Sequence, residues 1–161
     1  MTEQTQNSTV DPSNAIDRVN LDTWPEAARI QSPFALLMGA RVVSATRDRV
    51  EVVLEVRAEL LNRNGFLHGG AILAVADNLG GTTTFMNLDR ANTTTTVESK
   101  TNFFKSIAMG ETARFVCEPL HRGGRTMVLQ TSVYRGDGKL AAIVTQTQLI
   151  MSRSDPAIAR G

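Results

Sequence analysis

Residues 62–79 read NRNGFLHGGAILAVADNL, and this stretch decides how the rest of the chain is interpreted. The apolar residues of its second half recur at the i, i+3, i+4, i+7 spacing of one helix face: Ile72, Val75, Ala76 and Leu79. Residues 80–84 are glycines and threonines, which are poor helix formers and would allow the helix to end near Leu79. Because apolar residues follow them, we expect one buried helix over 71–86, with the glycines in close contact with a sheet.

The chemistry of this stretch lies at the start of that helix. Gly69 and Gly70 leave the first backbone N–H groups bare of neighbouring side chains, and these groups have no partner inside a helix. They lie at the positive end of the helix dipole, which binds anions or polarises a carbonyl. The side-chain amide of Asn62 or Asn64 would add a further donor. A glycine-rich loop that only joins a strand to the helix is the alternative interpretation.

Asp77 is the second polar feature of the helix. It either faces solvent or has a functional partner, because carboxylates are rarely buried alone. It follows His68 by nine residues, which is half a turn out of phase and roughly 13 Å along a helix. Asp77 therefore cannot easily serve the glycine terminus of its own chain. In a two-fold dimer each terminus would meet the partner's carboxylate, giving two equal composite sites.

The rest of the chain reads as strands with two short helices before them. Apolar and charged residues alternate over 50–57, and β-branched or alternating segments follow at 93–104, 113–117, 125–135 and 139–150. Gly136-Asp137-Gly138 is a hairpin signal between the last two. Short helices are expected over 25–30, with a proline in its first turn, and from the N-cap pair Ser32-Pro33 to a stop at Gly39. This order predicts an α+β domain with one helix packed on an antiparallel sheet.

Composition and charge exclude several functional classes. The 161 residues are 42% apolar, which suits one globular domain over 21–152, with tails at 1–20 and 153–161. A net charge of +1 argues against nucleic-acid binding, and no apolar run is long enough to span a membrane. The polar N-terminus has no signal-peptide core, so we expect a cytoplasmic protein. One cysteine, Cys117, and two histidines make a metal site improbable, and Cys117 alternates like a core thiol.

At this point a family resemblance can be stated. Asn62, Gly65, His68-Gly69-Gly70 and Asp77, at this spacing, resemble the signature of hotdog-fold acyl-CoA thioesterases of the PaaI type. The segment from Thr96 to Glu111 and the pair Gly124-Arg125 are similar to later strands of that family. The resemblance implies a long central helix wrapped by a curved antiparallel sheet. It also implies homodimers with active sites at the dimer interface, commonly assembled into homotetramers as dimers of dimers.

The resemblance also implies roles for individual residues. Asp77 would activate water or attack the thioester, while Asn62 and the backbone N–H of Gly70 would polarise its carbonyl. His68 would position the substrate, and Thr96 would help to hold the water. Three neighbours are expected beside the substrate: Gly65, Phe66 and Gly69. No metal and no separate cofactor are expected, since coenzyme A (CoA) is part of the substrate.

Basic residues outside the helix are candidates for the CoA phosphates. Arg122 and Arg125 border a Gly-rich turn between two strands, and Lys100 lies on the strand before them. Arginine suits phosphate recognition. The alternative is an exposed turn without a ligand.

Three functions remain after this interpretation. The leading one is an acyl-CoA thioesterase, in which water, a carboxylate and an oxyanion site are sufficient for hydrolysis. The alternative is a non-catalytic acyl-CoA-binding or regulatory module, which would not need Asp77 beside the thioester. The third, a hydratase or dehydratase, usually has an Asp/His arrangement that this helix lacks. A Gly-x-Ser-x-Gly motif is also missing, which argues against a serine hydrolase.

Overall fold

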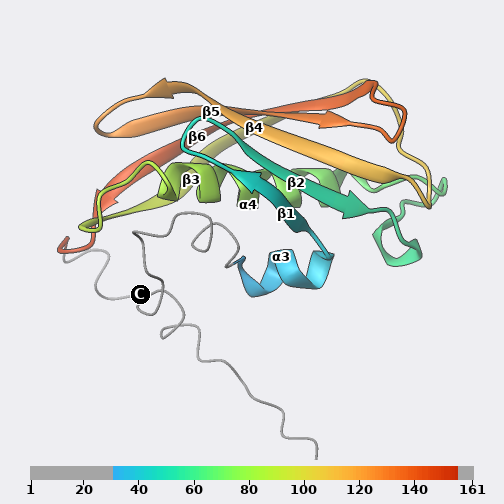
Figure 1. Ribbon diagram of the computed structural model, residues 1–161, viewed down its shortest axis with the longest axis horizontal. Helices are drawn as coiled ribbons and strands as arrows, with labels where there is room; N and C mark the ends of the chain where they lie inside the picture. The colour runs from blue at the N-terminus through green and yellow to red at the C-terminus, as the bar shows by residue number, and fades with distance from the viewer. Residues whose placement is uncertain (1–30, 156–161) are drawn as a thin grey trace, which may run out of the picture.

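The computed structural model describes residues 31–155 of the chain (Figure 1). In chain order the elements are α3 (Pro33–Met38), β1 (Arg41–Ala45), β2 (Val50–Glu55), the 3₁₀ helix η1 (Ala58–Leu60), α4 (Gly69–Phe85), β3 (Asn92–Phe103), β4 (Thr112–Arg122), β5 (Thr126–Tyr134) and β6 (Leu140–Ser152). The expected helix over 25–30 and the expected tail over 1–20 lie outside the described residues.

One antiparallel sheet and one long helix make up most of the fold. The six strands follow the order β1-β2-β4-β5-β6-β3, so β1 and β3 are the edges. The sheet curves over α4, and α3 lies on the side of α4 that faces away from the sheet (Figure 1). This arrangement confirms the predicted α+β class and the hotdog architecture of a central helix wrapped by a sheet.

The strands form where the sequence alternates. In β2 the side chains of Val50, Val52 and Leu54 are buried while Glu51 and Val53 between them are half-buried. The alternation places one face of the strand against α4, as period two requires. The predicted hairpin between β5 and β6 is also confirmed, with the backbone of Gly138 in the left-handed region at φ 79°.

Helix α4 continues through the glycine and threonine run to Phe85, which confirms the longer of the two predicted helices. The hydroxyls of Thr82 and Thr83 donate to backbone carbonyls four residues earlier, so these side chains are satisfied within the helix. Gly80 allows a strand side chain to come close, because a Cβ at this position would lie 2.1 Å from the Nε2 atom of Gln146. The buried stripe on this helix is the predicted one: Ile72, Val75, Ala76 and Leu79.

Helix α3 is bounded by the two residues that the sequence predicts. The Ser32 hydroxyl accepts from the Ala35 N–H and donates to the Asn78 side chain on α4, while Gly39 ends the helix in the left-handed conformation. The guanidinium of Arg57 donates to the carbonyls of Leu37 and Met38 at the same end. The Ser32 contact joins α3 to α4, and Arg57 joins the C-terminal end of α3 to the segment after β2.

The described part of the C-terminal segment contacts the start of β3. The backbone N–H of Arg153 donates to the Ala91 carbonyl at 2.9 Å, and its Nε donates to the Asn92 carbonyl at 3.0 Å. Residues 156–161 of the expected C-terminal tail lie outside the described residues. Over residues 31–155 we find no helix that is both long enough and apolar enough to cross a membrane.

Candidate active site

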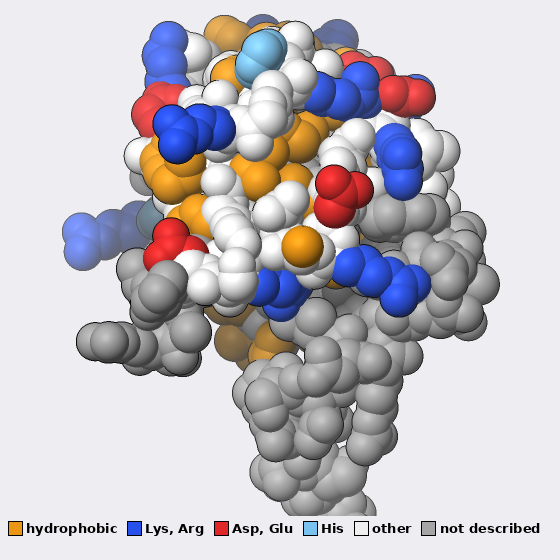
Figure 2. Space-filling model, turned by 90° about the vertical axis from the view of Figure 1, so that its left-hand side faces the viewer, with side chains coloured by type: hydrophobic (Ala, Val, Ile, Leu, Met, Phe, Trp, Pro, Cys, Tyr) orange, Lys and Arg blue, Asp and Glu red, His pale blue; other side chains and the backbone are white. Residues whose placement is uncertain are grey.

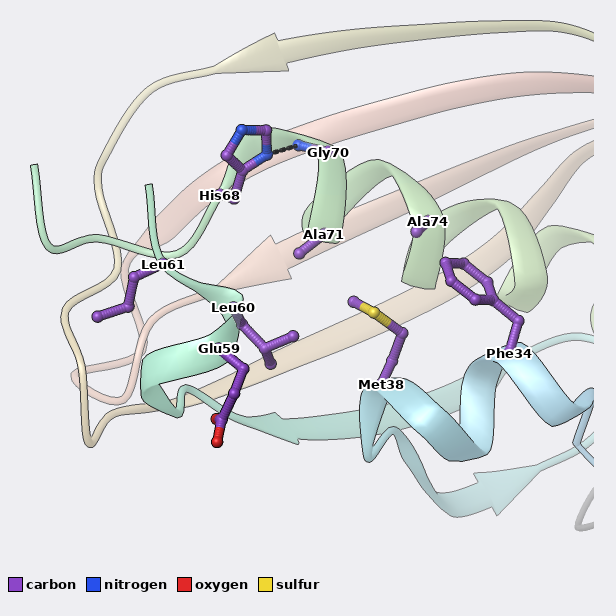
Figure 3. A pocket seen from close by; sticks show the side chains of 9 residues that line it. All are labelled: Phe34, Met38, Glu59, Leu60, Leu61, His68, Gly70, Ala71 and Ala74. Carbon is purple, nitrogen blue, oxygen red and sulfur yellow. Dashed lines mark hydrogen bonds between the residues drawn. The ribbon is translucent and has the colours of Figure 1, made fainter. Parts of the chain in front are cut away.

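The first turn of α4 carries the backbone donors expected at a carbonyl-binding site. His68 is its N-cap residue, and the imidazole Nδ1 accepts the Gly70 N–H at 2.9 Å (Figure 3). The Gly69 N–H has no acceptor within residues 31–155. The free donor of this turn is therefore Gly69, whereas the resemblance assigns that role to Gly70.

The loop before the helix aims the side chain of Asn62. Its Oδ1 accepts the backbone N–H groups of Asn64 and Phe66, at 2.9 and 3.2 Å. Gly65 closes this turn with a φ of 79°. With its oxygen engaged in this way, Asn62 presents an Nδ2 group that donates to no residue in the described range.

A polar hollow of about 470 Å³ is lined by both of these donor residues. Beside Asn62 and Gly69 it contains three phenylalanines and one cation, and its lining includes Asn64, Phe66, Phe103, Phe104, Lys105 and Ser106. The Phe103 ring lies over Gly69, because a Cβ there would be 3.0 Å from its Cζ. The hollow thus combines hydrogen-bond donors with aromatic walls.

A second, smaller hollow of about 300 Å³ lies between α3 and the start of α4. Phe34 and Met38 point from α3 toward Ala71 and Ala74 on α4, with Leu60 closing one side (Figure 3). Glu59 is its one carboxylate, and His68 and Gly70 border it. Its lining is mainly apolar, so it suits an apolar group attached near the helix N-terminus.

Asp77 lies further along α4, in contact with β3. The Thr96 hydroxyl donates to Asp77 Oδ1 at 2.7 Å, and Gln148 Nε2 donates to the Thr96 oxygen, also at 2.7 Å. Asp77 is half-buried. It lines neither hollow, and its half-buried, hydrogen-bonded position differs from a fully solvent-facing carboxylate.

The predicted basic residues are not gathered at the glycine terminus. Arg122 forms an ion pair with Asp48 at 2.6 Å and also donates to the Arg47 carbonyl. Asn87, just beyond the C-terminal end of α4, donates to that same carbonyl. Whereas Gly69 begins α4, the C-terminal end of β4, which contains Arg122, is therefore close to the opposite, C-terminal end of that helix.

The surface at that end carries mixed charge. In Figure 2, Lys and Arg side chains are spread around the rim with Asp and Glu among them. Lys100 is exposed on the edge strand β3 and has no partner in the described part of the chain. Phosphate binding by Lys100, Arg122 or Arg125 stays a prediction.

Two further kinds of site remain to be considered: a nucleophilic thiol at Cys117 and a metal site. Cys117 is fully buried, and this burial raises the pKa of its thiol, so it is a core residue and not an accessible nucleophile. Residues 31–155 contain no cluster of three or more His, Cys, Asp or Glu side chains.

Sequence reasoning missed the two buried glutamines of β6, Gln146 and Gln148, each 1% exposed. Gln148 contacts Thr96, and Gln146 Nε2 lies 3.4 Å from the Asp77 carbonyl oxygen. The signal that points to them is their spacing of two residues after Val144, which puts all three on one face of the strand.

Comparisons with known proteins identify the family of this chain. The sequence pattern described as "Thioesterase superfamily" matches residues 64–142, which include the glycine terminus and Asp77. A protein of Deinococcus radiodurans is 31% identical over 126 residues, 77% of this chain and 80% of that protein. The 1,4-dihydroxy-2-naphthoyl-CoA hydrolase of Escherichia coli is 28% identical over 104 residues, 65% of this chain and 76% of the enzyme.

A solved structure of a related fold is also similar to this one. The structure of the E. coli PaaI protein, from the phenylacetic acid degradation operon, superposes with a TM-score of 0.74 and 17% identity. The match covers 82% of this chain and 94% of PaaI, and at this identity it concerns the fold alone. With the sequence pattern spanning α4 and strands β3 to β5, and a relative 31% identical over 80% of its length, the chain belongs to the thioesterase superfamily and is a hotdog-fold thioester hydrolase.

Proposed function

We propose that the protein hydrolyses acyl-CoA thioesters, with Asp77 as the general base. The observation that carries this proposal is the half-buried Asp77 carboxylate, whose Oδ1 is held by the Thr96 hydroxyl at 2.7 Å while Oδ2 has no partner among residues 31–155. The relationship to a protein named as a CoA-thioester hydrolase supports the substrate class. A carboxylate held in this way is suited to accept a proton from water.

We infer that each active site is shared between two copies of the chain. Gly69 and Asp77 are eight residues apart on one helix, which is about 12 Å along its axis. Neither hollow beside the glycine terminus is lined by Asp77. One thioester carbonyl cannot meet both groups in one protomer, so the partner supplies the carboxylate.

The edge strand β3 offers a surface for that partner. It has 12 residues and pairs only with β6, and Val97 and Phe103 on it are each 56% exposed. A long, exposed edge strand has unpaired backbone N–H and C=O groups along one side, which can pair with another chain. Thr96, the residue that contacts Asp77, lies on the same strand, so a copy paired at β3 would be close to the carboxylate. Two such dimers would form the proposed homotetramer.

The reaction follows from these positions. The carbonyl oxygen accepts from the Gly69 N–H and from the Asn62 amide, which stabilise its negative charge. Water attacks the carbonyl carbon as Asp77 of the opposite copy takes its proton. The tetrahedral intermediate collapses with cleavage of the C–S bond, and the proton held by Asp77 passes to the thiolate. The products are a carboxylic acid and CoA.

The two hollows divide the substrate by polarity. We assign the acyl group to the apolar hollow between α3 and α4. The amide-containing arm of CoA suits the polar hollow, where Asn62 and Asn64 are available. Lys105 on its lining and the exposed Lys100 on β3 are candidate cations for the phosphates.

Thiol release from a panel of acyl-CoA substrates tests the proposal. We expect Asp77→Asn to lower kcat by about 100-fold or more, the usual contribution of a general base. Its side-chain oxygen still accepts from Thr96, so folding should be retained. Asp137→Asn, in the exposed β5–β6 turn, is the control. Binding of acyl-CoA in calorimetry without thiol release would instead support the binding-module alternative, and full activity of Asp77→Asn would contradict the role of Asp77.

A further inference from the structure

A chain of side-chain hydrogen bonds runs behind Asp77 through the edge of the sheet. Thr94 Oγ1 donates to Gln148 Oε1 at 2.8 Å and also lies 3.1 Å from the Leu149 carbonyl oxygen. Gln148 Nε2 donates to Thr96 Oγ1, which in turn donates to Asp77 Oδ1, both at 2.7 Å. These hydrogen bonds link α4, β3 and β6, and the central residue of the series, Gln148, is 1% exposed.

The direction of this chain is determined by the charge at its end. An ionised carboxylate only accepts hydrogen bonds, so the single proton of the Thr96 hydroxyl must point toward Asp77. The Thr96 oxygen then accepts from the amide N–H of Gln148, which leaves the amide oxygen to accept from Thr94. If the Gln148 amide were reversed, Thr96 would donate to Gln148, and Asp77 would lose its donor.

We propose that Gln148 is a positioning residue: its amide N–H donates to the Thr96 oxygen, so that the Thr96 hydroxyl donates to Asp77. This inference rests on the proposed function. With Oδ1 held, the carboxylate has one orientation, and Oδ2 is left to take the proton from water. A catalytic group must be held within a narrow range of geometry for its reaction. Loss of Gln148 should therefore slow the chemical step and leave substrate binding unchanged.

The neighbouring Gln146 has a different function, although its burial is the same. Its Nε2 lies 3.4 Å from the backbone carbonyl of Asp77, and its side chain packs against Gly80. It makes no hydrogen bond to the carboxylate or to Thr96 among the described residues. Burial of a glutamine on β6 is thus insufficient for the role, and the contact with Thr96 is what distinguishes Gln148.

A double-mutant cycle on Gln148 and Thr96 tests the inference in the intact oligomer. Gln148→Leu should lower kcat about tenfold, the upper end of the usual contribution of one hydrogen bond, with KM unchanged. The double variant Gln148→Leu/Thr96→Val should be no slower than Thr96→Val alone, because both changes remove the same contact. Thr101→Val, which changes another buried hydroxyl of β3 that lacks a partner, is the control.

Thr94→Val provides a second variant if Gln148→Leu fails to fold. It keeps the volume at this position and removes the donor that orients Gln148, so a smaller fall in kcat with unchanged KM is expected. Two results would overturn the inference in a protein whose Asp77→Asn variant is inactive. One is a wild-type kcat in Gln148→Leu or in Thr94→Val. The other is a double variant in which the effects of Gln148→Leu and Thr96→Val are independent. An active Asp77→Asn would overturn the proposed function, and with it this role of Gln148.

Discussion

The imidazole Nδ1 of His68 accepts the backbone N–H of Gly70 at 2.9 Å, so the residue before α4 caps the helix with its own ring. This contact occupies one of the first-turn donors and leaves the Gly69 N–H as the free one. A substrate carbonyl can bind at Gly69 without displacing the ring. His68 thus stabilises the helix terminus on which the proposed oxyanion site depends.

The stability of the terminus should depend on this cap. We expect His68→Ala to lower the free energy of unfolding by about 1 kcal/mol, the typical cost of losing an N-cap. His68→Asn should restore most of it, because an asparagine oxygen also accepts first-turn N–H groups. Urea unfolding measures the difference, with His121→Ala at an exposed position as the control. Equal unfolding free energies for His68→Ala and the wild type would mean that the capping bond contributes nothing.

Two adjacent glycines in α4 should respond in opposite ways to alanine. A Cβ at Gly80 would lie 2.1 Å from Gln146 Nε2 and 2.3 Å from its Cδ, whereas a Cβ at Gly81 meets nothing within 4 Å. Gly80→Ala should therefore destabilise the protein by about 1–3 kcal/mol through overpacking. Gly81→Ala should stabilise it by about 0.5–1 kcal/mol, the difference in helix propensity. Urea unfolding of both variants gives the comparison, and the same sign at both positions would contradict it.

Local signals in the sequence were sufficient for most of the fold. The stripe from Ile72 to Leu79, the Ser32 and Gly39 caps and the β5–β6 turn each depend on residues close in sequence, and the structure confirms them. The strand β1 was not specified, since Arg41–Ala45 is short and has no clear alternation. The length of α4 was harder to predict, because helix propensity disfavours the glycine and threonine run. In this run Gly80 lies close to Gln146, 66 residues later, a contact that helix propensity does not reflect.

The site was less predictable, because it depends on contacts between distant segments. The motif pointed to Asp77 and Thr96 separately, and only the fold brings them together. Gln148 was missed because residues 145–148 are all polar, and only the two-residue spacing from Val144 assigns Gln146 and Gln148 to the buried face. The ion pair of Arg122 with Asp48, 74 residues earlier, was likewise invisible in the sequence.

The carboxylate of Glu111 should make stability depend on pH. The N–H of Ala108 at 2.9 Å lowers its pKa in the folded protein, with smaller contributions from the Gly136 N–H and Arg135. A pKa lowered on folding stabilises the protein above the unfolded value of about 4.3, and this contribution is lost as the pH falls through the folded value. Glu111→Gln should thus cost about 1 kcal/mol at neutral pH.

The pH series distinguishes this charge effect from a loss of packing. The difference in unfolding free energy between Glu111→Gln and the wild type should decrease steadily below the unfolded pKa. It should disappear once Glu111 is protonated in both the folded and the unfolded wild type. Glu118→Gln, at an exposed position of β4, is the matched control and should give no such trend. A gap that stays constant from neutral to acid pH would assign the cost to geometry instead of charge.

The apolar hollow should set the preference for the acyl group. Ala74 lines it from α4, opposite Phe34. Ala74→Leu would fill part of the space, and we expect kcat/KM for longer acyl chains to fall about tenfold relative to acetyl-CoA, as for a pocket that loses room for a methylene or two. Leu73→Met, at the adjacent exposed position, is the control. An equal loss for every chain length would place the acyl group elsewhere.

Hybrid dimers test whether the site is shared between two copies. One copy carries Asp77→Asn and the other Asn62→Ala, and each homodimer alone is expected to be inactive or nearly so. If Asn62 of one copy works with Asp77 of the other, a hybrid has one intact site and one doubly damaged site. Random pairing of equal amounts makes half of the dimers hybrid, so about one quarter of the wild-type activity should return.

The same mixture gives a different result if the site lies within one protomer. Each copy of the hybrid would then contain one damaged residue of its own site, and no activity would return. The two chains must be mixed before assembly, by co-expression or by joint refolding, and hybrid formation is measured independently with two affinity tags. Thiol release by purified hybrids would support the shared site, because only in the shared site can the Asn62 amide and the Asp77 carboxylate of different chains act on the same thioester.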